Sequence, residues 1–281
     1  MKELGLEISQ SKLVPPSTQV VCLGILVDSK ARTISISPEK LQEIILMCRQ
    51  WSTKNVVSKT QFQSLLGSLL YICCCVKPAR FFLNRMLQLL RDNHERTKIK
   101  LTAEFFKDLN WFNVFLKSHN GIVFYNIKPS NIQVHLDACL TGLGGIYDNM
   151  VYSLPLESQN ILHITQIECL NIIVAIKIWA KIWTNKRISI FCDNLAVVEV
   201  LSTGKTKDSY LGTCARNVWM LMSLFNIQID FFHIPGKANV VADLLSRWHI
   251  SQNPQQKLNS YVPNHKWMHV HPNLLCLNFC I

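Results

Sequence analysis

Four acidic residues in the second half of the chain occupy positions from which a folded sheet could bring them together. Asp137 and Asp193 each end a segment with the pattern of a strand, and Glu168 lies near the start of a long apolar helix expected between those segments. Two strands joined by such a helix are candidates for parallel neighbours, and α/β sheets place their sites at the carboxyl ends of parallel strands. Asp243, near the last expected helix, could complete a cluster of four.

Carboxylates gathered in this way repel one another, so such a cluster is stable chiefly when hard divalent cations neutralise it. Mg²⁺ suits it best, and Mn²⁺ is an alternative. Two such ions about 3.5–4 Å apart can activate a water and stabilise the leaving oxygen of a phosphodiester. The sequence therefore offers Asp137, Glu168, Asp193 and Asp243 as candidate catalytic and metal-binding residues of a phosphodiester hydrolase.

Each acid also has a purely structural interpretation. Thr165-x-x-Glu168 has the form of a capping box, in which Glu168 only ties down the start of the helix. Asp193 and Asp243 could likewise be acids at helix N-termini, where the helix dipole favours negative charge. Taken singly, these structural roles are the more common ones.

The elements that must position the acids follow from the periodicity after residue 130. An apolar residue at every second position predicts three antiparallel strands, followed by alternating helices and strands in the order βββαβαβα. This order is that of one α/β domain with a mixed sheet, over residues 130–248. The expected strands are 132–137, 144–147, 151–154, 188–192 and 227–233, and the expected helices are 165–183, 194–201, 208–226 and one from about 239.

The first part of the chain has a different plan. Residues 18–36 alternate like a β-hairpin, and Ser37-Pro38 then predicts an N-cap with proline at the first helical position, opening a helix up to Trp51. Further helical patterns fill 58–75, 78–91 and 102–117. The stretch 121–130, which contains Pro129, breaks the pattern and is the expected domain boundary.

The positive charge is concentrated in this first part. The chain has a net charge of +11, and residues 1–129 hold 18 Lys and Arg against 9 Asp and Glu. Residues 51–100 hold nine basic and two acidic residues, a density suited to a phosphate backbone. The alternative is an ordinary solvated helix face.

Composition excludes several other classes of protein. With 49% hydrophobic and 17% charged residues the chain is expected to fold, and no apolar run is long enough for a membrane-spanning helix. The first residues lack the plan of a secretory signal, so we expect an intracellular protein of the cytoplasm or nucleus, with its cysteines reduced.

The C-terminal tail, 249–281, is left without an expected structure. It contains His265, His269, His271, Cys276 and Cys280. Zinc could bind such residue types, but their spacing matches no zinc module, and a tail without a metal is the preferred interpretation.

The four acids stand in runs that together resemble a known family. The end of the second domain resembles that of a retrotransposon ribonuclease H in the run His233-Ile-Pro-Gly-Lys-Ala-Asn-Val-Val-Ala-Asp243-Leu-Leu-Ser-Arg-Trp248. Earlier motifs of that family are matched, in order, by Asp137-Ala-Cys-Leu-Thr-Gly-Leu-Gly-Gly, Ile167-Glu-Cys-Leu-Asn and Cys192-Asp193-Asn-Leu-Ala-Val. The resemblance implies a ribonuclease H-like mixed five-stranded sheet with flanking helices. It also implies that the four acids bind two Mg²⁺ ions and cut the RNA strand of an RNA–DNA hybrid.

The first part resembles the reverse transcriptase of the same elements, DIRS-like or gypsy-type, in the region just upstream of the nuclease. The matching runs are Leu4-Gly-Leu-Glu-Ile-Ser-Gln-Ser-Lys-Leu-Val-Pro-Pro, Leu23-Gly-Ile-Leu-Val-Asp28, Gln63-Ser-Leu-Leu-Gly67 and Leu101-Thr-Ala-Glu104. By this resemblance residues 1–36 are the end of the palm and 37–125 a helical thumb or connection region. The chain has no Asp-Asp pair, so the Tyr-x-Asp-Asp strand of the polymerase is missing and nucleotide addition is not expected. That polymerase region is expected upstream in the original polyprotein.

Three functions compete. The leading hypothesis is a metal-dependent ribonuclease H joined to a basic region that holds an RNA–DNA hybrid or another duplex. The second is a catalytically inactive, nucleic-acid-binding remnant of a decayed retrotransposon, and the third is DNA cleavage or strand transfer on the same fold. Many ribonucleases H place a histidine before the last acid, and here spacing favours His233 whereas strand pairing favours Lys237. The alternation of its strand favours a packed role for His233.

Overall fold

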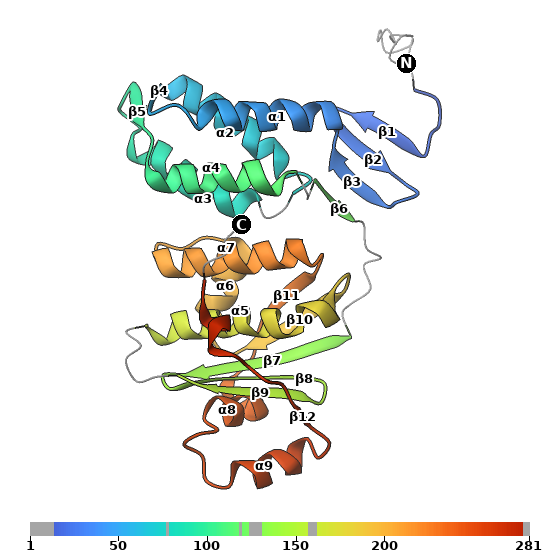
Figure 1. The fold of residues 1–281 in the computed structure, drawn as a ribbon, viewed down its shortest axis with the longest axis vertical. Helices are drawn as coiled ribbons and strands as arrows, with labels where there is room; N and C mark the ends of the chain where they lie inside the picture. The colour runs from blue at the N-terminus through green and yellow to red at the C-terminus, as the bar shows by residue number, and fades with distance from the viewer. Residues whose placement is uncertain (1–13, 77–78, 118–119, 124–130, 157–161, 278–281) are drawn as a thin grey trace, which may run out of the picture. The chain divides into compact units, whose positions relative to one another are not determined.

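The computed structural model describes most of the chain. The described residues are 14–76, 79–117, 120–123, 131–156 and 162–277 (Figure 1). The chain divides into two compact units, Met1–Ala79 with Arg85–Ile127, and Arg80–Asn84 with Lys128–Ile281. Among the described helices none has the length and apolar character needed to cross a membrane.

The first unit begins with an antiparallel sheet in the order β1-β2-β3-β6, formed by Gln19–Cys22, Ile25–Asp28, Thr33–Ile36 and Gly121–Val123. The predicted hairpin over 18–36 is in fact three strands. An extra turn at Leu23 and Gly24, both with positive φ (51° and 78°), separates β1 from β2. β6 lies in the expected boundary stretch but pairs with β3, so the first sheet extends further along the chain than the sequence pattern indicated.

Four helices follow, as their apolar periodicity predicted. They are α1 Pro38–Trp51, α2 Lys59–Ile72, α3 Ala79–Asp92 and α4 Ala103–Phe115. Ser37, Ser58 and Thr102 cap the first, second and fourth through side-chain hydrogen bonds to main-chain N–H groups. The sequence pattern missed a two-stranded sheet of β4 Val56–Ser58 and β5 Lys98–Lys100, because three-residue strands carry almost no periodic signal.

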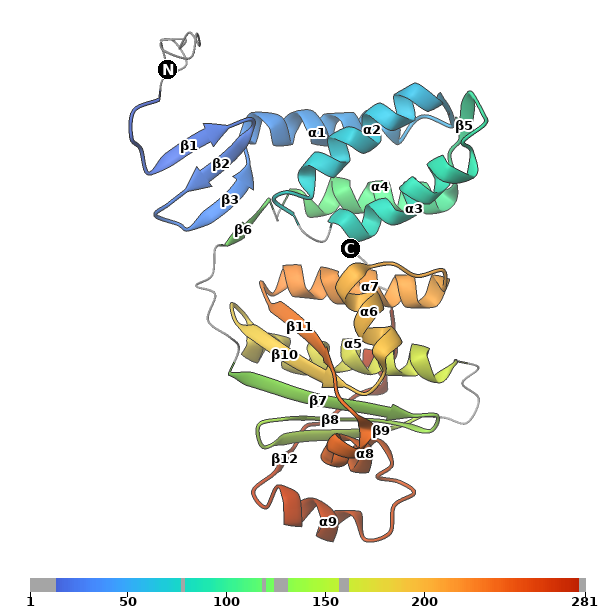
Figure 2. The ribbon, with the colours of Figure 1, turned by 180° about the vertical axis from the view of Figure 1, so that it is seen from behind.

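The second unit contains a six-stranded mixed sheet in the order β11-β10-β7-β8-β9-β12 (Figure 2). β7, β8 and β9 are antiparallel neighbours, and β10 pairs in parallel with both β7 and β11. The predicted mixed α/β fold with five strands is confirmed, and β12 is added to it. The strands are β7 Ile132–Cys139, β8 Gly142–Tyr147, β9 Met150–Pro155, β10 Arg187–Cys192, β11 Gln228–His233 and β12 Lys266–Trp267.

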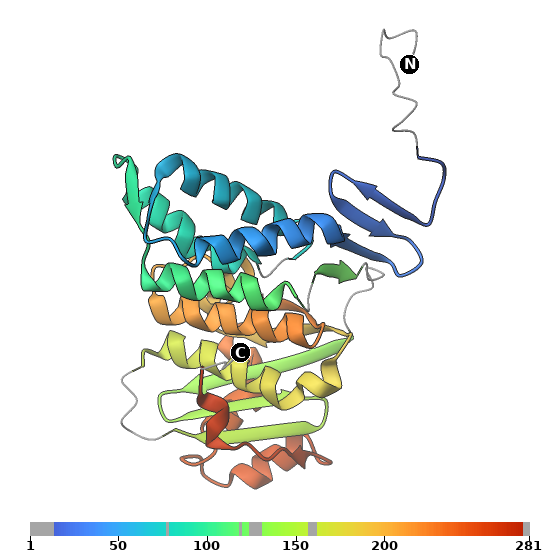
Figure 3. The ribbon, with the colours of Figure 1, turned by 45° about the horizontal axis from the view of Figure 1, so that its top comes forward.

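Helices cover both faces of this sheet. Figure 3 shows α5 Ile164–Trp183 lying across the central strands, and α7 Ser209–Leu224 packs against α5. α6 Leu195–Thr203 follows β10, while α8 Val240–Ser246 lies on the opposite face over β7, β8 and β9. The predicted acidic residues therefore lie where α5 and α8 pack on the strands from opposite faces of the sheet.

The tail forms part of the second unit. Its helix α9 Pro254–Tyr261 places the fully buried Leu258 against Val151, Leu244 and Leu245, and β12 pairs in parallel with β9. A 3₁₀ turn at Pro272–Leu275 follows, and Lys177 Nζ donates to the carbonyl oxygens of Leu274 (3.0 Å) and Cys276 (2.7 Å). These contacts give residues 254–276 a packed structure that the sequence pattern did not predict.

Two of the tail histidines considered for zinc have other contacts. The His265 ring meets the Val262 carbonyl oxygen and the Gln255 side chain, and the His271 ring accepts from the Asn273 N–H. Within the described part of the tail, His and Cys side chains form no cluster with metal-ligand spacing. Cys280 lies outside the described residues.

Candidate metal-binding site

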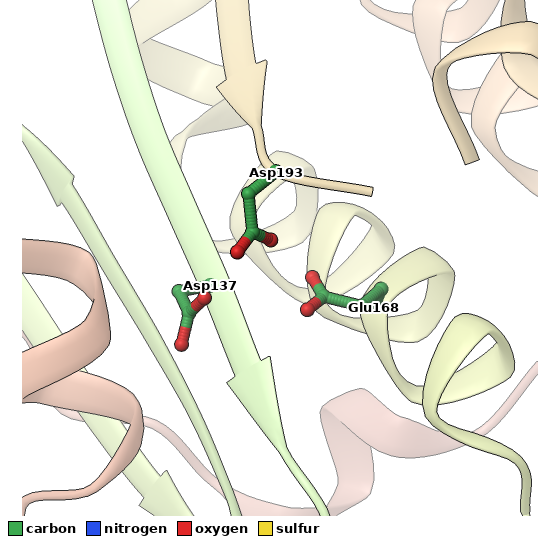
Figure 4. A group of neighbouring side chains, drawn as sticks. All are labelled: Asp137, Glu168 and Asp193. Carbon is green, nitrogen blue, oxygen red and sulfur yellow. The ribbon is translucent and has the colours of Figure 1, made fainter. Parts of the chain in front are cut away.

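Three of the four predicted acids meet at the end of the central strands. Asp137 belongs to β7, Glu168 to the second turn of α5, and Asp193 follows β10 directly. Each offers one carboxylate oxygen to a group whose atoms all lie within 4.8 Å of one another (Figure 4). The parallel pairing of β7 with β10 brings the two aspartates together, and the helix that joins these strands brings the glutamate.

Asp137 is more deeply buried than its strand pattern suggested. The alternation along β7 is as predicted, with Val134 and Leu136 buried and Gln133 exposed on the other face. By this alternation Asp137 shares the face of Gln133 and His135, which predicts that it points away from the core, but only 4% of it is exposed because α8 covers this end of the strand. The hydroxyl of Ser246, in α8, donates to Asp137 Oδ2 at 2.5 Å.

Burial and mutual repulsion make the cluster resist ionisation. Burial raises the pKa of Glu168 to about 9, and the nearby Asp137 and Asp193 charges add to the effect. Burial also raises the pKa of Asp137 to about 6, while the Ser246 hydrogen bond opposes this rise and the Asp193 and Asp243 charges reinforce it. Without a cation, Glu168 therefore keeps a proton that an ordinary carboxyl group would have lost at neutral pH.

The capping-box interpretation of Glu168 is wrong. The N-cap of α5 is His163, whose ring accepts from the Thr165 N–H at 3.3 Å, and Gln166 Oε1 accepts from the His163 N–H at 3.1 Å. Gln166 therefore completes the box, and Glu168 lies one turn further in, with 4% of it exposed. Glu168 has no capping role that would explain a buried carboxyl group here.

A buried asparagine, which the sequence analysis missed, ties Glu168's helix to Asp137's strand. Asn171 is fully buried, and its Nδ2 donates to the carbonyl oxygens of Asp137 (2.7 Å) and Gly144 (2.9 Å), residues paired across β7 and β8. Its Oδ1 accepts from the Tyr152 hydroxyl at 2.6 Å. An amide in an otherwise apolar helix, three residues after an acid, is the signal that could have identified it.

Asp243 stands beside the three-acid group. It lies in the first turn of α8 with about half of its side chain exposed, and its Oδ1 pairs with Arg247 Nε at 2.6 Å. It is close enough for its charge to raise the pKa of Asp137, but among the described residues the group within 4.8 Å contains only the other three acids. Its position is compatible with both the helix-terminus and the site interpretation.

Neither basic candidate before the last acid has a packed environment. His233, at the end of β11, is exposed, and its Nε2 lies 3.1 Å from the Asp193 carbonyl oxygen, so the packed role predicted for it is wrong. Lys237 is exposed in the short 3₁₀ turn Gly236–Ala238. Gly236 lies close to the site, since a Cβ there would stand 3.0 Å from Asp193 Oδ2.

The donor set of the three-acid group fits a hard divalent cation. It consists only of carboxylate oxygens, and two of its members are almost fully buried. Burial raises the pKa of both Asp137 and Glu168, although the Arg247 charge opposes the rise at Asp137. A divalent cation would supply positive charge and favour the ionised carboxylates. Asp137, Glu168 and Asp193 are the residues that would hold it, with Asp243 at the edge.

The basic region of the first unit is only partly free to meet a polyanion. Arg85 forms an ion pair with the buried Asp108, so it supports the helix packing. Arg91, Arg96, Lys98 and Lys100 are exposed at the end of α3 and on β5. These four are an exposed basic stretch of the predicted segment, although the exposed Asp92 and Glu95 lie among them.

Fold and site together define an α/β domain with a carboxylate cluster at the carboxyl ends of its parallel strands. Residues 148–249 match a family model described as reverse transcriptase-like, a span that includes Glu168, Asp193 and Asp243 and begins after Asp137. No curated protein matches the chain.

Solved structures give distant likenesses. A ribonuclease H1 from the halophilic archaeon Halobacterium salinarum is 17% identical, with 41% of this chain and 92% of that chain covered and a TM-score of 0.34. A foamy viral protease-reverse transcriptase in complex with double-stranded DNA is 12% identical, with 77% and 38% covered and a TM-score of 0.34. The same viral protein in complex with RNA/DNA hybrid is 13% identical, with 76% and 29% covered and a TM-score of 0.34. This chain thus spans well under half of the viral protein.

Proposed function

We propose that this chain is a metal-dependent endonuclease that cleaves the RNA strand of RNA–DNA hybrids and derives from a retroelement reverse transcriptase. The observation that carries the proposal is the meeting of Asp137, Glu168 and Asp193 oxygens within 4.8 Å at the end of the parallel strands. The reverse transcriptase-like match over residues 148–249 supports the same class of protein.

In this proposal the four acids hold two Mg²⁺ ions, with Mn²⁺ as a substitute. When bound, the ions supply an activated water and neutralise the charge that develops on the leaving oxygen. Asp137 and Glu168 lie buried in the sheet and α5, so they fix the site against the rigid core. Glu168 must give up its proton before it can serve as a ligand, because its pKa of about 9 keeps it neutral at pH 7.

The first unit would hold the duplex. We propose that residues 1–36 correspond to the end of a polymerase palm and 37–125 to a thumb or connection region. The exposed Arg91, Arg96, Lys98 and Lys100 would contact phosphates without reading sequence. Selection of the RNA strand would come from its 2′-hydroxyl groups. The chain has no Asp-Asp pair, so we expect no primer extension.

Cleavage of a hybrid with a labelled RNA strand tests this function. The parent chain should cut the RNA in Mg²⁺, leave the DNA strand whole, and stop on chelation. Asp193→Asn removes a charge from the cluster and should lower the rate at least about 100-fold, since even residues that only support metal ligands contribute 10- to 100-fold. Asp148→Asn, in an exposed turn, is the matched control and should cleave like the parent.

The main alternative is an inactive nucleic-acid-binding remnant. It predicts hybrid binding by the parent chain without cleavage in either Mg²⁺ or Mn²⁺. Cleavage of the DNA strand at a comparable rate would instead favour a DNA nuclease on the same fold.

A further inference from the structure

The inference concerns Ser246, and it rests on the proposed function. Ser246 is fully buried at the end of α8, the helix that also carries Asp243. Its Oγ lies 2.5 Å from Asp137 Oδ2 and 3.0 Å from the Asp243 carbonyl oxygen. A hydroxyl has one proton, and an ionised carboxylate is the stronger acceptor of the two, so the proton goes to Asp137.

Two glycines of β8 make this contact possible. A Cβ at Gly144 would lie 2.2 Å from the Ser246 main-chain nitrogen, and a Cβ at Gly142 would lie 2.3 Å from the Ser246 carbonyl oxygen. Any side chain at these positions would push α8 away from the sheet. Gly144 is also paired with Asp137 across β7 and β8, so the glycine opening lies directly beside the carboxylate that Ser246 reaches.

The main chain of Ser246 is fixed as well. Its carbonyl oxygen accepts from Cys139 Sγ at 3.3 Å, two residues beyond Asp137 on the same strand. The neighbouring Leu244 and Leu245 pack with Val151 and Leu258, which anchors α8 on β9 and the tail. The hydroxyl therefore reaches Asp137 from a rigid support.

We propose that Ser246 is a positioning residue for Asp137. It satisfies one carboxylate oxygen and fixes the rotation of the group, so that the other oxygen remains directed to the shared site with Glu168 and Asp193. A hydrogen bond to a ligating carboxylate orients it, and supporting residues of this kind contribute 10- to 100-fold to metal affinity.

Isothermal titration calorimetry of Mn²⁺ binding to the full chain tests the proposal without requiring catalysis. Ser246→Ala should raise the Mn²⁺ dissociation constant about 10- to 100-fold, with the circular dichroism spectrum unchanged. Ser246→Cys keeps the branching of the side chain, is somewhat larger, and offers a weaker donor, so its Mn²⁺ affinity should fall between those of the parent and Ser246→Ala. Ser223→Ala, which removes a similar hydroxyl bonded to the Trp219 carbonyl oxygen in α7, should bind Mn²⁺ like the parent.

The outcomes separate this inference from the proposed function. Mn²⁺ affinities equal to the parent's in folded Ser246→Ala and Ser246→Cys would overturn the positioning role even if the parent cleaves hybrids. Weakened Mn²⁺ binding in a chain that cleaves nothing would support the positioning role and count against the nuclease. If Ser246→Ala does not fold, the Ser246→Cys titration decides alone, and a parent that binds no Mn²⁺ overturns the inference.

Discussion

The buried charge of Glu168 leads to a quantitative expectation for Glu168→Gln. The folded chain holds the pKa of this carboxyl at about 9, against 4.5 in an exposed peptide, mainly through burial and then through the Asp137 and Asp193 charges. The unfolded chain therefore binds fewer protons than the folded one between these two values. Stability of the metal-free protein must fall as the pH rises through this window.

The size of the effect follows from the same values. Between pH 4.5 and pH 7 the free energy of unfolding falls by about 1.36 kcal/mol per pH unit because of Glu168, which gives a loss of about 3 kcal/mol at pH 7 as an upper limit. Glutamine carries no charge and can still accept the hydrogen bond that the Ala138 N–H gives Glu168. We therefore expect Glu168→Gln to stabilise the metal-free chain by about 2–3 kcal/mol at pH 7 and by less than about 1 kcal/mol near pH 5.

Urea unfolding in a chelator, at pH 5, 6, 7 and 8, measures this difference. Because the chain has two units, the midpoint of the same transition must be compared between variants. Glu199→Gln, on an exposed position of α6, is the control and should track the parent at every pH. Added Mg²⁺ should raise the midpoint of the parent more than that of Glu168→Gln. The reasoning would be refuted if Glu168→Gln were less stable than the parent, or if the difference in stability between the two were the same at all four pH values.

Three further expectations concern the supports of the site and its partner. Asn171→Ala removes the amide bonds to two buried carbonyl groups and the short bond from the Tyr152 hydroxyl, which keeps a longer contact of 3.4 Å to the carbonyl oxygen of residue 171. Unfolding should therefore be easier by about 2–4 kcal/mol, against about 1 kcal/mol for Tyr152→Phe, and equal losses would contradict the network. Leu258→Ala should cost about 2–4 kcal/mol in urea unfolding if the tail is part of the domain, and a loss under about 0.5 kcal/mol would contradict that packing. If four residues contact phosphates, the affinity for a hybrid, measured by fluorescence anisotropy, should fall about 100-fold between 50 and 200 mM salt. The double variant Lys98→Gln/Lys100→Gln should make this salt dependence less steep, and an affinity of the parent that does not change with salt would exclude phosphate binding by the four residues.

Local signals explain why so much of the fold was predictable. Alternation over β7 and helical spacing from α1 to α8 depend only on neighbours in the sequence, and the caps at Ser37 and Thr102 are short-range hydrogen bonds. Short strands gave no such signal, so β4, β5 and β12 were missed. The turn at Leu23 and Gly24 was missed because an alternating pattern continues through it.

The proximity of three of the four predicted acids could be predicted from the sequence, but their environment could not. Asp137, Glu168 and Asp193 were assembled correctly because a parallel crossover places strand ends together whatever the side chains are. The burial of Asp137 depends instead on how closely α8 approaches β8, and that distance is set by Gly142 and Gly144, a hundred residues away from Ser246 in sequence. No pattern within either segment contains this information.

The same reasoning explains why the structural alternatives were hard to reject from sequence. Thr165-x-x-Glu168 matches the usual pattern of a capping box, whereas His163-x-x-Gln166 does not, because histidine is not a usual capping residue. The structure nevertheless places the N-cap at His163, so only the actual first turn of α5 decides the matter. Once the helix begins at Ile164, Glu168 and Asn171 fall one turn apart on the face turned to the sheet. A buried amide binds the Asp137 main chain, and one turn before it a buried acid brings a carboxylate oxygen within 4.8 Å of those of Asp137 and Asp193. Burial and repulsion raise the pKa of Glu168 to about 9, so its ionised form is unfavourable without a partner of opposite charge. A divalent cation would supply that charge, which is the physical reason to expect a cation here.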